Sequence, residues 1–238
     1  AIDLTSQVPA RARVVSFAAD DHLLMLVFHH IACDAMTHGV VAEELAELYN
    51  AAVEGRANRL PRDPVQYTDY AAWEQSRRVD VDYWRAQLAG ITPLDLPTDR
   101  PRPAVRDWAG ATVPVALSPE VTASLAGLAR AHGTTLYVVL LTAFQALLAR
   151  YAGRRDVAVG TAVSGRARRE LLRLVGYAYN TVVLRARWGE DESFGGLLTA
   201  NRDTVLDAFD HADAPFFRLV RELRPDRDPS VTPLFQVM

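Results

Sequence analysis

An irregular alternation of short strand-like runs and longer helix-like stretches constrains the fold of this chain most strongly. Runs rich in valine, leucine and threonine predict strands at residues 11–17, 22–30, 112–117, 157–163 and 181–188, and a final strand at 235–238. Apolar residues at helical spacing predict helices at residues 37–53, 67–88, 118–131, 134–151 and 194–209. Because helices and strands alternate without a regular repeat, we expect an α/β or α+β fold.

A proline-rich segment divides this pattern. Four prolines fall within residues 93–103, and the strand-and-helix pattern restarts after them, which predicts two lobes with a boundary near residue 100. The uninterrupted apolar run at residues 23–28 predicts a strand that is buried on both faces. The chain does not start with methionine and stops within a strand-like run, so we expect a fragment of a larger polypeptide.

The composition excludes several classes of protein. Of the 238 residues, 50% are hydrophobic, which is enough for a sizeable core and excludes a disordered chain. The net charge of −3 comes from interspersed charges, with no basic tract that would bind nucleic acid. No apolar run approaches the roughly 20 residues that a membrane helix needs. Cys33 is the single cysteine, which excludes an internal disulfide and favours a reducing, cytoplasmic location.

Residues 29–35, HHIACDA, carry the most chemical information. His30 ends an expected strand, and Asp34 follows four residues later at the turn into an expected helix. A histidine is suited to general base catalysis because its ordinary pKa is about 6.5. An aspartate one turn away can orient a neighbouring ring, or fix the loop through an arginine. The alternative is a purely structural histidine, which is the commoner situation on an apolar strand.

A metal site is another interpretation of this segment. His30, Asp34 and His38 follow each other at intervals of four residues, which would place them on one face of a helix. Since His30 ends a strand, we do not expect the three to share a helix. The chain also contains no cysteine cluster and no HExxH motif, so we expect no metal.

Five segments together resemble a known family. Residues 29–35 resemble the HHxxxDG motif of the condensation domains of nonribosomal peptide synthetases, members of the chloramphenicol-acetyltransferase-like acyltransferase superfamily. Four further segments resemble the family motifs YxDYAxW, VGxFVNT, HQDxPFE and RDxSRNPL, in that order: residues 67–73 (YTDYAAW), 175–181 (VGYAYNT), 211–216 (HADAPF) and 227–234 (RDPSVTPL). One motif alone is weak, but five in family order across the whole chain are highly specific.

The resemblance implies an architecture and a set of partners. Two chloramphenicol-acetyltransferase-like lobes of an α+β sandwich would form a V-shaped pseudo-dimer with a central tunnel, both incomplete here. Residues 1–100 would be the remainder of the N-terminal lobe and the linker, and residues 101–238 most of the C-terminal lobe, together one partial condensation domain. The implied partners are upstream and downstream peptidyl carrier domains and an adjacent adenylation domain of the same polypeptide, with no nucleic acid and no membrane. No cofactor is bound directly, because the carrier domains hold the substrates on phosphopantetheine arms.

The resemblance also implies roles for individual residues. His30 is the active-site histidine, which either removes the amine proton or positions the amine, and His29 is a structural support. Asp34 pairs with an arginine of the other lobe, and Arg166 is the expected partner in a partly buried, bidentate pair. Asn180 is expected to position or hydrogen-bond groups near the tunnel.

Ala35 is the main departure from the motif, because the family has a glycine at this position. Alanine would be strained there only if the backbone φ is positive.

The implied reaction is amide-bond formation, in which a carrier-bound aminoacyl amine attacks an upstream carrier-bound aminoacyl or peptidyl thioester. Two alternatives share the superfamily: an epimerisation domain that moves an α-proton, and a catalytically silent recruitment domain. Gly39 and the ending of the last motif favour condensation, and epimerisation domains usually carry Ser-Trp where this chain has Thr37 and His38. Intact His30 and Asp34 argue against a silent domain.

Overall fold

The computed structural model describes residues 2–101, 103, 109–223 and 231–238. Within them the chain forms two compact units. The first comprises Ala1–Arg78 and Ser164–Tyr179, and the second comprises Val79–Val163 and Asn180–Met238. This division differs from the boundary expected near residue 100, because residues 79–100 pack with the second unit and residues 164–179 pack with the first.

The proline-rich segment is anchored to the second unit. Leu94 is buried in the core of that unit, and its N–H donates to Oε1 of Gln236 at 2.5 Å. The carbonyl of Pro93 accepts a hydrogen bond from Nη1 of Arg154 at 2.8 Å. Prolines interrupt helices and sheets but do not prevent packing against a core, so the proline content did not mark the observed boundary.

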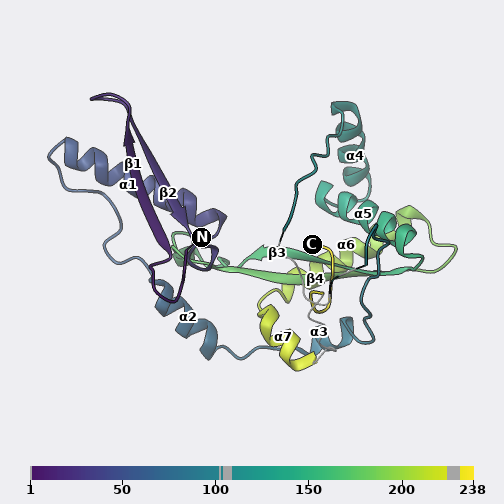
Figure 1. Ribbon diagram of the computed structural model, residues 1–238. Helices are drawn as coiled ribbons and strands as arrows, with labels where there is room; N and C mark the ends of the chain where they lie inside the picture. The colour runs from purple at the N-terminus through teal and green to yellow at the C-terminus, as the bar shows by residue number, and fades with distance from the viewer. Residues whose placement is uncertain (1, 102, 104–108, 224–230) are drawn as a thin grey trace. The chain divides into compact units, whose positions relative to one another are not determined.

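The first unit starts with a β-hairpin. Strands β1 (Ala10–Ser16) and β2 (His22–Phe28) are antiparallel, with Ala10 opposite Phe28 and Ser16 opposite His22. The remaining elements of the unit are two helices, α1 (Ala35–Val53) and α2 (Tyr67–Ser76) (Figure 1). Two short 3-10 turns, η1 (His30–Ala32) and η2 (Arg169–Leu171), belong to the same unit. The hairpin therefore leads directly into the HHIACDA turn.

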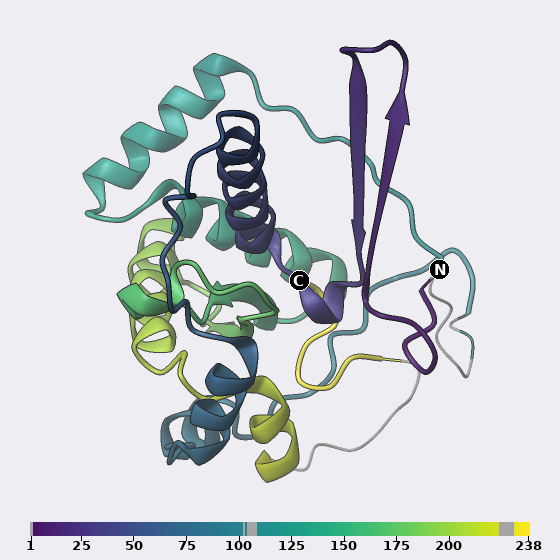
Figure 2. The same cartoon turned by 90° about the vertical axis from the view of Figure 1, so that its left-hand side faces the viewer.

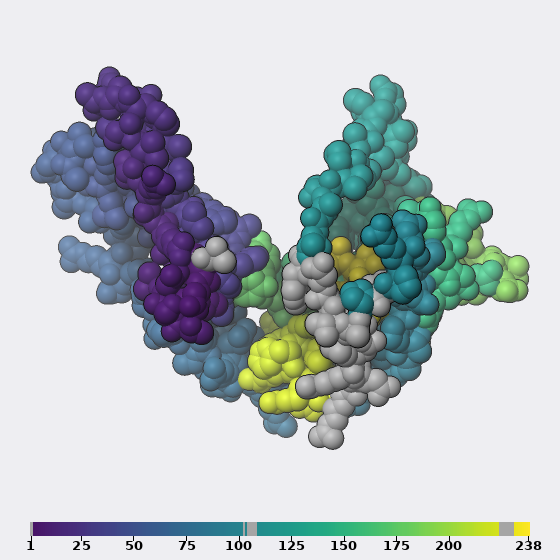
Figure 3. All heavy atoms as spheres, viewed as in Figure 1, coloured from purple at the N-terminus to yellow at the C-terminus, as the bar shows by residue number. Residues whose placement is uncertain are grey.

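Strand β2 is exposed, so the prediction of burial on both faces is wrong. Its central residues 23–27 each expose between 37% and 51% of their surface. Figure 2 shows the hairpin extending away from α1, and Figure 3 shows its side chains (purple) at the surface. An apolar run indicates that a strand needs a cover, but the cover is a tertiary contact, and the described residues of this unit do not supply it.

The second unit contains a two-stranded sheet packed with helices. Its elements are α3 (Asp82–Gln87), α4 (Pro119–Ala131), α5 (Leu136–Ala152), β3 (Asp156–Ser164), β4 (Tyr179–Arg187), α6 (Phe194–Asp210) and α7 (Phe216–Leu223), where Ser164 and Tyr179 count with the first unit. Strands β3 and β4 pair, and α5 packs against both α4 and α6 (Figure 1). Helix α5 and strands β3 and β4 contribute half of the buried residues of the core, which confirms the expected apolar stripe of residues 134–151.

Local capping explains why the helix bounds of this unit were predictable. Ser118, Thr135 and Ser193 cap the N-termini of α4, α5 and α6, because each side-chain oxygen accepts the backbone N–H three residues further on. Pro119 occupies the first turn of α4, where its missing N–H costs no hydrogen bond. Gly153 ends α5 in the left-handed conformation, with φ of 65°.

Several expected elements differ from the structure. Residues 112–117 and 235–238 form no strand, the helix expected at 67–88 is divided into α2 and α3, and α7 was not expected. The expected helix breaks because Arg77 has an extended backbone, with φ of −68° and ψ of 136°. A strand also requires a partner for its backbone groups, which a β-branched run does not provide by itself. The motif at 227–234 falls partly outside the described residues.

Membrane-span criteria are met by no single helix in the described part of the chain. Helices α4 and α5 together pass the length and composition test, with a bend of 104° between them.

Candidate active site

The HHIACDA segment connects β2 to α1 and contains two helix N-caps, one for η1 and one for α1. His29 precedes η1 with an extended backbone, and its Nδ1 accepts the N–H of Ile31 at 3.1 Å. Asp34 is the N-cap of α1, and its Oδ1 accepts the N–H of Thr37 at 3.0 Å. Both side chains start a helical turn, which explains why the motif separates them by a fixed number of residues.

One ring nitrogen of His30, Nδ1, is hydrogen-bonded to the backbone. Its Nδ1 lies 2.7 Å from the carbonyl oxygen of Cys33, which can only accept, so Nδ1 carries the proton and donates it. In the neutral ring the lone pair is then on Nε2. His30 is exposed among the described residues, whereas the sequence predicted the end of a buried strand. The imidazole therefore presents the free lone pair that a general base needs.

The ion pair expected between Asp34 and Arg166 is present. Nη1 of Arg166 lies 2.5 Å from Oδ2 of Asp34, and neither side chain has any exposed surface. The pair is therefore fully buried, whereas partial burial was expected. The resemblance implied an arginine from the other lobe. In the structure, Asp34 and Arg166 belong to the same compact unit.

The pair is not bidentate, which corrects the second part of that expectation. Nη2 of Arg166 donates to the carbonyls of Leu174 at 3.0 Å and Gly176 at 3.1 Å, not to the carboxylate. The buried Nε has no partner among the described residues. The reason is that Oδ1 of Asp34 already accepts from Thr37, so the carboxylate is divided between a helix cap and the guanidinium.

The contacts of Asp34 determine its charge. Burial by itself raises the pKa of a carboxyl group, but Arg166 and the N–H groups of Ala178 and Thr37 outweigh it and hold the pKa of Asp34 below its ordinary value. Oδ2 accepts the N–H of Ala178 at 3.0 Å. Since the carboxylate is ionised and saturated with donors, it fixes the backbone and is not suited to exchange a proton.

Thr37 and Gly176 complete this buried network. The Thr37 hydroxyl lies 2.9 Å from the Gly176 carbonyl oxygen and accepts the Gly176 N–H at 3.1 Å. Gly176 has φ of 153°, and a Cβ there would overlap the ring of Tyr67. The Tyr67 hydroxyl in turn donates to the carbonyl of Tyr177 at 3.0 Å. The sequence motifs contain these residues, but nothing in their spacing indicates that they meet.

Ala35 is unstrained. It is the first residue of α1, and Leu234 is the one described non-glycine residue with a positive φ. The replacement of the motif glycine is therefore sterically mild.

Asn180 belongs to the second unit, where its whole side chain is hydrogen-bonded. Its amide nitrogen donates to the carbonyls of Ala212 at 2.8 Å and Ala214 at 2.7 Å, and its amide oxygen accepts the N–H of Phe216 at 2.9 Å. The hydrogen-bonding role that was expected is thus directed at the loop before α7.

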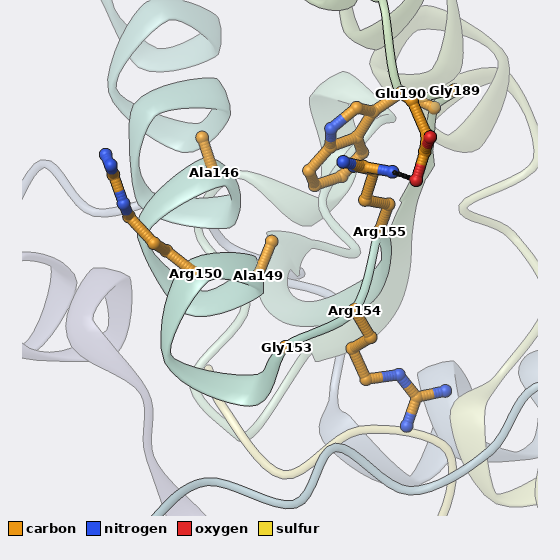
Figure 4. A pocket seen from close by; sticks show the side chains of 9 residues that line it. Ala146, Ala149, Arg150, Gly153, Arg154, Arg155, Gly189 and Glu190 are labelled. Atoms are coloured by element: carbon orange, nitrogen blue, oxygen red, sulfur yellow. Dashed lines mark hydrogen bonds and ion pairs between the residues drawn. The ribbon is translucent and has the colours of Figure 1, made fainter.

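The other candidate sites are weaker. Among the described residues, no group of three or more His, Cys, Asp or Glu side chains could hold a metal ion. A cavity of about 880 Å³ lies in the second unit, between the end of α5 and the end of β4. Figure 4 shows Arg155 paired with Glu190 beside it, at 3.0 Å, whereas Arg150 and Arg154 point away from each other. Because these arginines do not converge, the cavity is not built for one anion.

Comparison with known proteins agrees with the five motifs. The Condensation domain family matches residues 1–238, the entire chain. Tyrocidine synthase 2 of Brevibacillus parabrevis is 41% identical over 243 residues, covering 99% of this chain and 7% of that protein. Phosphinothricin tripeptide synthetase PhsC of Streptomyces viridochromogenes is 42% identical, covering 99% of this chain and 22% of that protein.

Solved structures show the same fold. The X-domain from teicoplanin biosynthesis has a TM-score of 0.90 and 28% identity, covering 99% of this chain and 55% of that chain. The first condensation domain of the CDA synthetase has a TM-score of 0.69 and 28% identity, covering 90% of this chain and 49% of that chain. This chain therefore spans about half the length of these structures, and a much smaller share of the synthetases.

The chain belongs to the condensation-domain family, and the predicted resemblance is confirmed. The α+β class is confirmed with it.

Proposed function

We propose that this chain is part of a condensation domain that forms an amide bond between two carrier-bound substrates in a nonribosomal peptide synthetase. The observation that carries the proposal is the state of His30, which is exposed and has Nδ1 bound to Cys33 and the lone pair on Nε2. The turn that holds it is fixed by the buried pair of Asp34 and Arg166. Similarity to tyrocidine synthase and to phosphinothricin tripeptide synthetase supports aminoacyl or peptidyl thioesters as the substrate class.

In the proposed reaction, the lone pair of the acceptor amine attacks the thioester carbonyl of the donor. A C–N bond forms, the C–S bond breaks, and the proton lost by the amine ends on the thiol of the donor arm. His30 either carries this proton through Nε2 or holds the amine in place. An α-amine has an ordinary pKa of about 7.7–8.0, so a large part of the rate can come from holding the two reactants together, worth up to about 7–11 kcal/mol.

The finer features implied by the family are part of the same proposal. Upstream and downstream carrier domains would deliver the substrates on phosphopantetheine arms, and an adenylation domain of the same polypeptide would supply activated amino acids. The complete domain would have two lobes in a V-shaped arrangement around a tunnel. The enzyme would be cytoplasmic. The related synthetases support these partners, because this chain covers only a small share of their length and leaves room for further domains.

The test uses the complete synthetase with a donor and an acceptor carrier, each loaded with an aminoacyl thioester, and follows the acceptor by intact mass. We expect dipeptide on the acceptor, and at least a ~100-fold lower rate for His30→Ala, the size typical of one acid–base group. His22→Ala is the matched control, because His22 bonds to Ser16 in the hairpin, outside this turn. Equal rates for wild type and His30→Ala would remove His30 from the mechanism.

The alternatives give different products in the same assay. An epimerisation domain would exchange the α-proton of its substrate with deuterium from the solvent and form no amide. A silent recruitment domain would do neither with any pair of substrates. Either result would overturn the proposal.

A further inference from the structure

We propose that Tyr177 is a positioning residue for His30: its ring holds the imidazole so that Nε2 faces the acceptor amine. The inference rests on the proposed function, because it assigns the orientation of the same histidine. The family pattern VGxFVNT specifies no residue type at this position, so the sequence motif alone does not single out Tyr177.

The two rings form an edge-to-face pair. Their centroids are 5.2 Å apart and their planes make an angle of 79°. This geometry is favourable for aromatic rings, which prefer offset or perpendicular arrangements at about 4.5–7 Å. Both residues are exposed among the described residues, so the contact is at the surface of the unit, where a substrate can approach.

His30 needs this second contact. Its bond to the Cys33 carbonyl, at 2.7 Å, fixes the position of Nδ1 and the location of the proton. One hydrogen bond does not prevent the ring from rocking about that bond, and such motion would move Nε2. A ring packed against the imidazole restricts the motion, since positioned groups lose catalytic efficiency when displaced by about 1 Å.

The backbone of Tyr177 is fixed on both sides by the buried ion pair. The carbonyl of Gly176 accepts from Arg166 at 3.1 Å, and the N–H of Ala178 donates to Asp34 at 3.0 Å. The neighbouring residues of Tyr177 are therefore bound to opposite members of the pair. Because Asp34 also caps α1, four residues after His30, the pair joins the two segments that carry the rings.

A further bond fixes Tyr177 itself. The hydroxyl of Tyr67 donates to the Tyr177 carbonyl at 3.0 Å. This hydrogen bond uses the backbone of Tyr177, and the ring of Tyr177 packs edge-to-face against His30. The function of the buried network is then to present this ring to His30.

The experiment compares Tyr177→Leu and Tyr177→Phe in the complete synthetase, with Tyr49→Leu as the matched control. Tyr49 lies on α1 and is 70% exposed. For Tyr177→Leu we expect kcat of amide formation to fall by about 2- to 10-fold with an unchanged KM, the range for losing one aromatic pair. Tyr177→Phe keeps the ring and should retain the wild-type rate.

The second measurement does not depend on the reaction. Diethyl pyrocarbonate modifies accessible neutral imidazole nitrogens, and peptide fragmentation separates His30 from His29. We expect His30 to be modified faster in Tyr177→Leu than in wild type, Tyr177→Phe and Tyr49→Leu. The rate at His22 reports any general loosening of the unit, and should stay constant.

The outcomes separate this inference from the proposed function. If wild type forms no amide, the proposed function fails, and the modification rates alone decide the role of Tyr177. Unchanged modification of His30 in Tyr177→Leu would overturn the inference, whatever the effect on kcat. Faster modification of His30 and His22 together would also overturn it, because Tyr177 would then only stabilise the fold.

Discussion

Oδ2 of Asp34 accepts hydrogen bonds from Nη1 of Arg166 at 2.5 Å and from the N–H of Ala178 at 3.0 Å, and both charged side chains are fully buried. The carboxylate starts helix α1, and the two partners of its Oδ2 lie more than a hundred residues further along the chain. A buried ion pair adds little net stability compared with apolar residues, but removing one partner leaves a buried charge without compensation. The first two predictions follow from this asymmetry.

Replacing Arg166 by Met should lower the free energy of unfolding of the complete domain by about 3–5 kcal/mol, because the carboxylate of Asp34 then loses its counter-charge. Urea unfolding measures the change. Arg173→Met is the matched control, since Arg173 pairs with Glu43 and Glu44 at the surface and should cost at most about 1 kcal/mol. Equal losses for the two variants would contradict the structural role of the buried pair.

Acid should remove the contribution of Asp34. Its folded-state pKa lies below the ordinary value of 3.8, so the ionised carboxylate stabilises the fold above pH 3.8 and loses this contribution as the pH falls through the lowered pKa. The difference in unfolding free energy between wild type and Asp34→Asn should be constant near neutral pH and shrink below pH 3.8. Urea unfolding over a series of pH values tests it. If the difference in unfolding free energy grows on acidification, the pKa of Asp34 is not lowered by folding.

Gly176→Ala should be strongly destabilising. With φ of 153° and a new Cβ that would overlap the Tyr67 ring, alanine has both an unfavourable backbone and no space. The thermal unfolding temperature should fall, and the Tyr67 hydrogen bond to Tyr177 should break. In contrast, Gly39→Ala in α1 meets nothing within 4 Å and should be neutral or stabilise the helix by up to about 1 kcal/mol. A stable Gly176→Ala variant would refute this packing of Gly176 against Tyr67.

Asn180→Ala should loosen the loop before α7. It removes two donors from the carbonyls of Ala212 and Ala214 and the acceptor of the Phe216 N–H, which should cost about 1–3 kcal/mol. Hydrogen exchange of the Phe216 amide should become faster, while Asn50→Ala on the exposed face of α1 should leave it unchanged. Slow exchange in Asn180→Ala would mean that the loop is held by other contacts.

The features predicted correctly are those that depend on residues close together in the sequence. Helices α4 and α6 were predicted to within a residue at each end. The strand–turn–helix order around His30 was also correct, although the strand is shorter and an additional 3-10 turn follows it. These features depend on hydrogen bonds between residues that are a few positions apart, so spacing and residue type are enough.

Predictions that require a tertiary partner were less successful. Residues 23–27 have the composition of a buried strand and are exposed, and residues 112–117 have the composition of a strand and form none. The two compact units divide elsewhere than near residue 100, because Leu94 packs into the core of the second unit despite the prolines around it. Composition measures a tendency to be buried, whereas burial needs a surface that lies elsewhere in the chain.

The sequence by itself determined the family, the bounds of helices α4, α5 and α6 to within two residues, and the chemistry of the HHIACDA turn, because each depends on residue type at short spacing. The family resemblance also named Arg166 as the partner of Asp34. Only the tertiary structure decided that this pair is singly bonded and fully buried, and that Tyr177 contacts His30. Such contacts depend on how two distant segments pack in three dimensions, and the geometry of that packing is not contained in any local pattern.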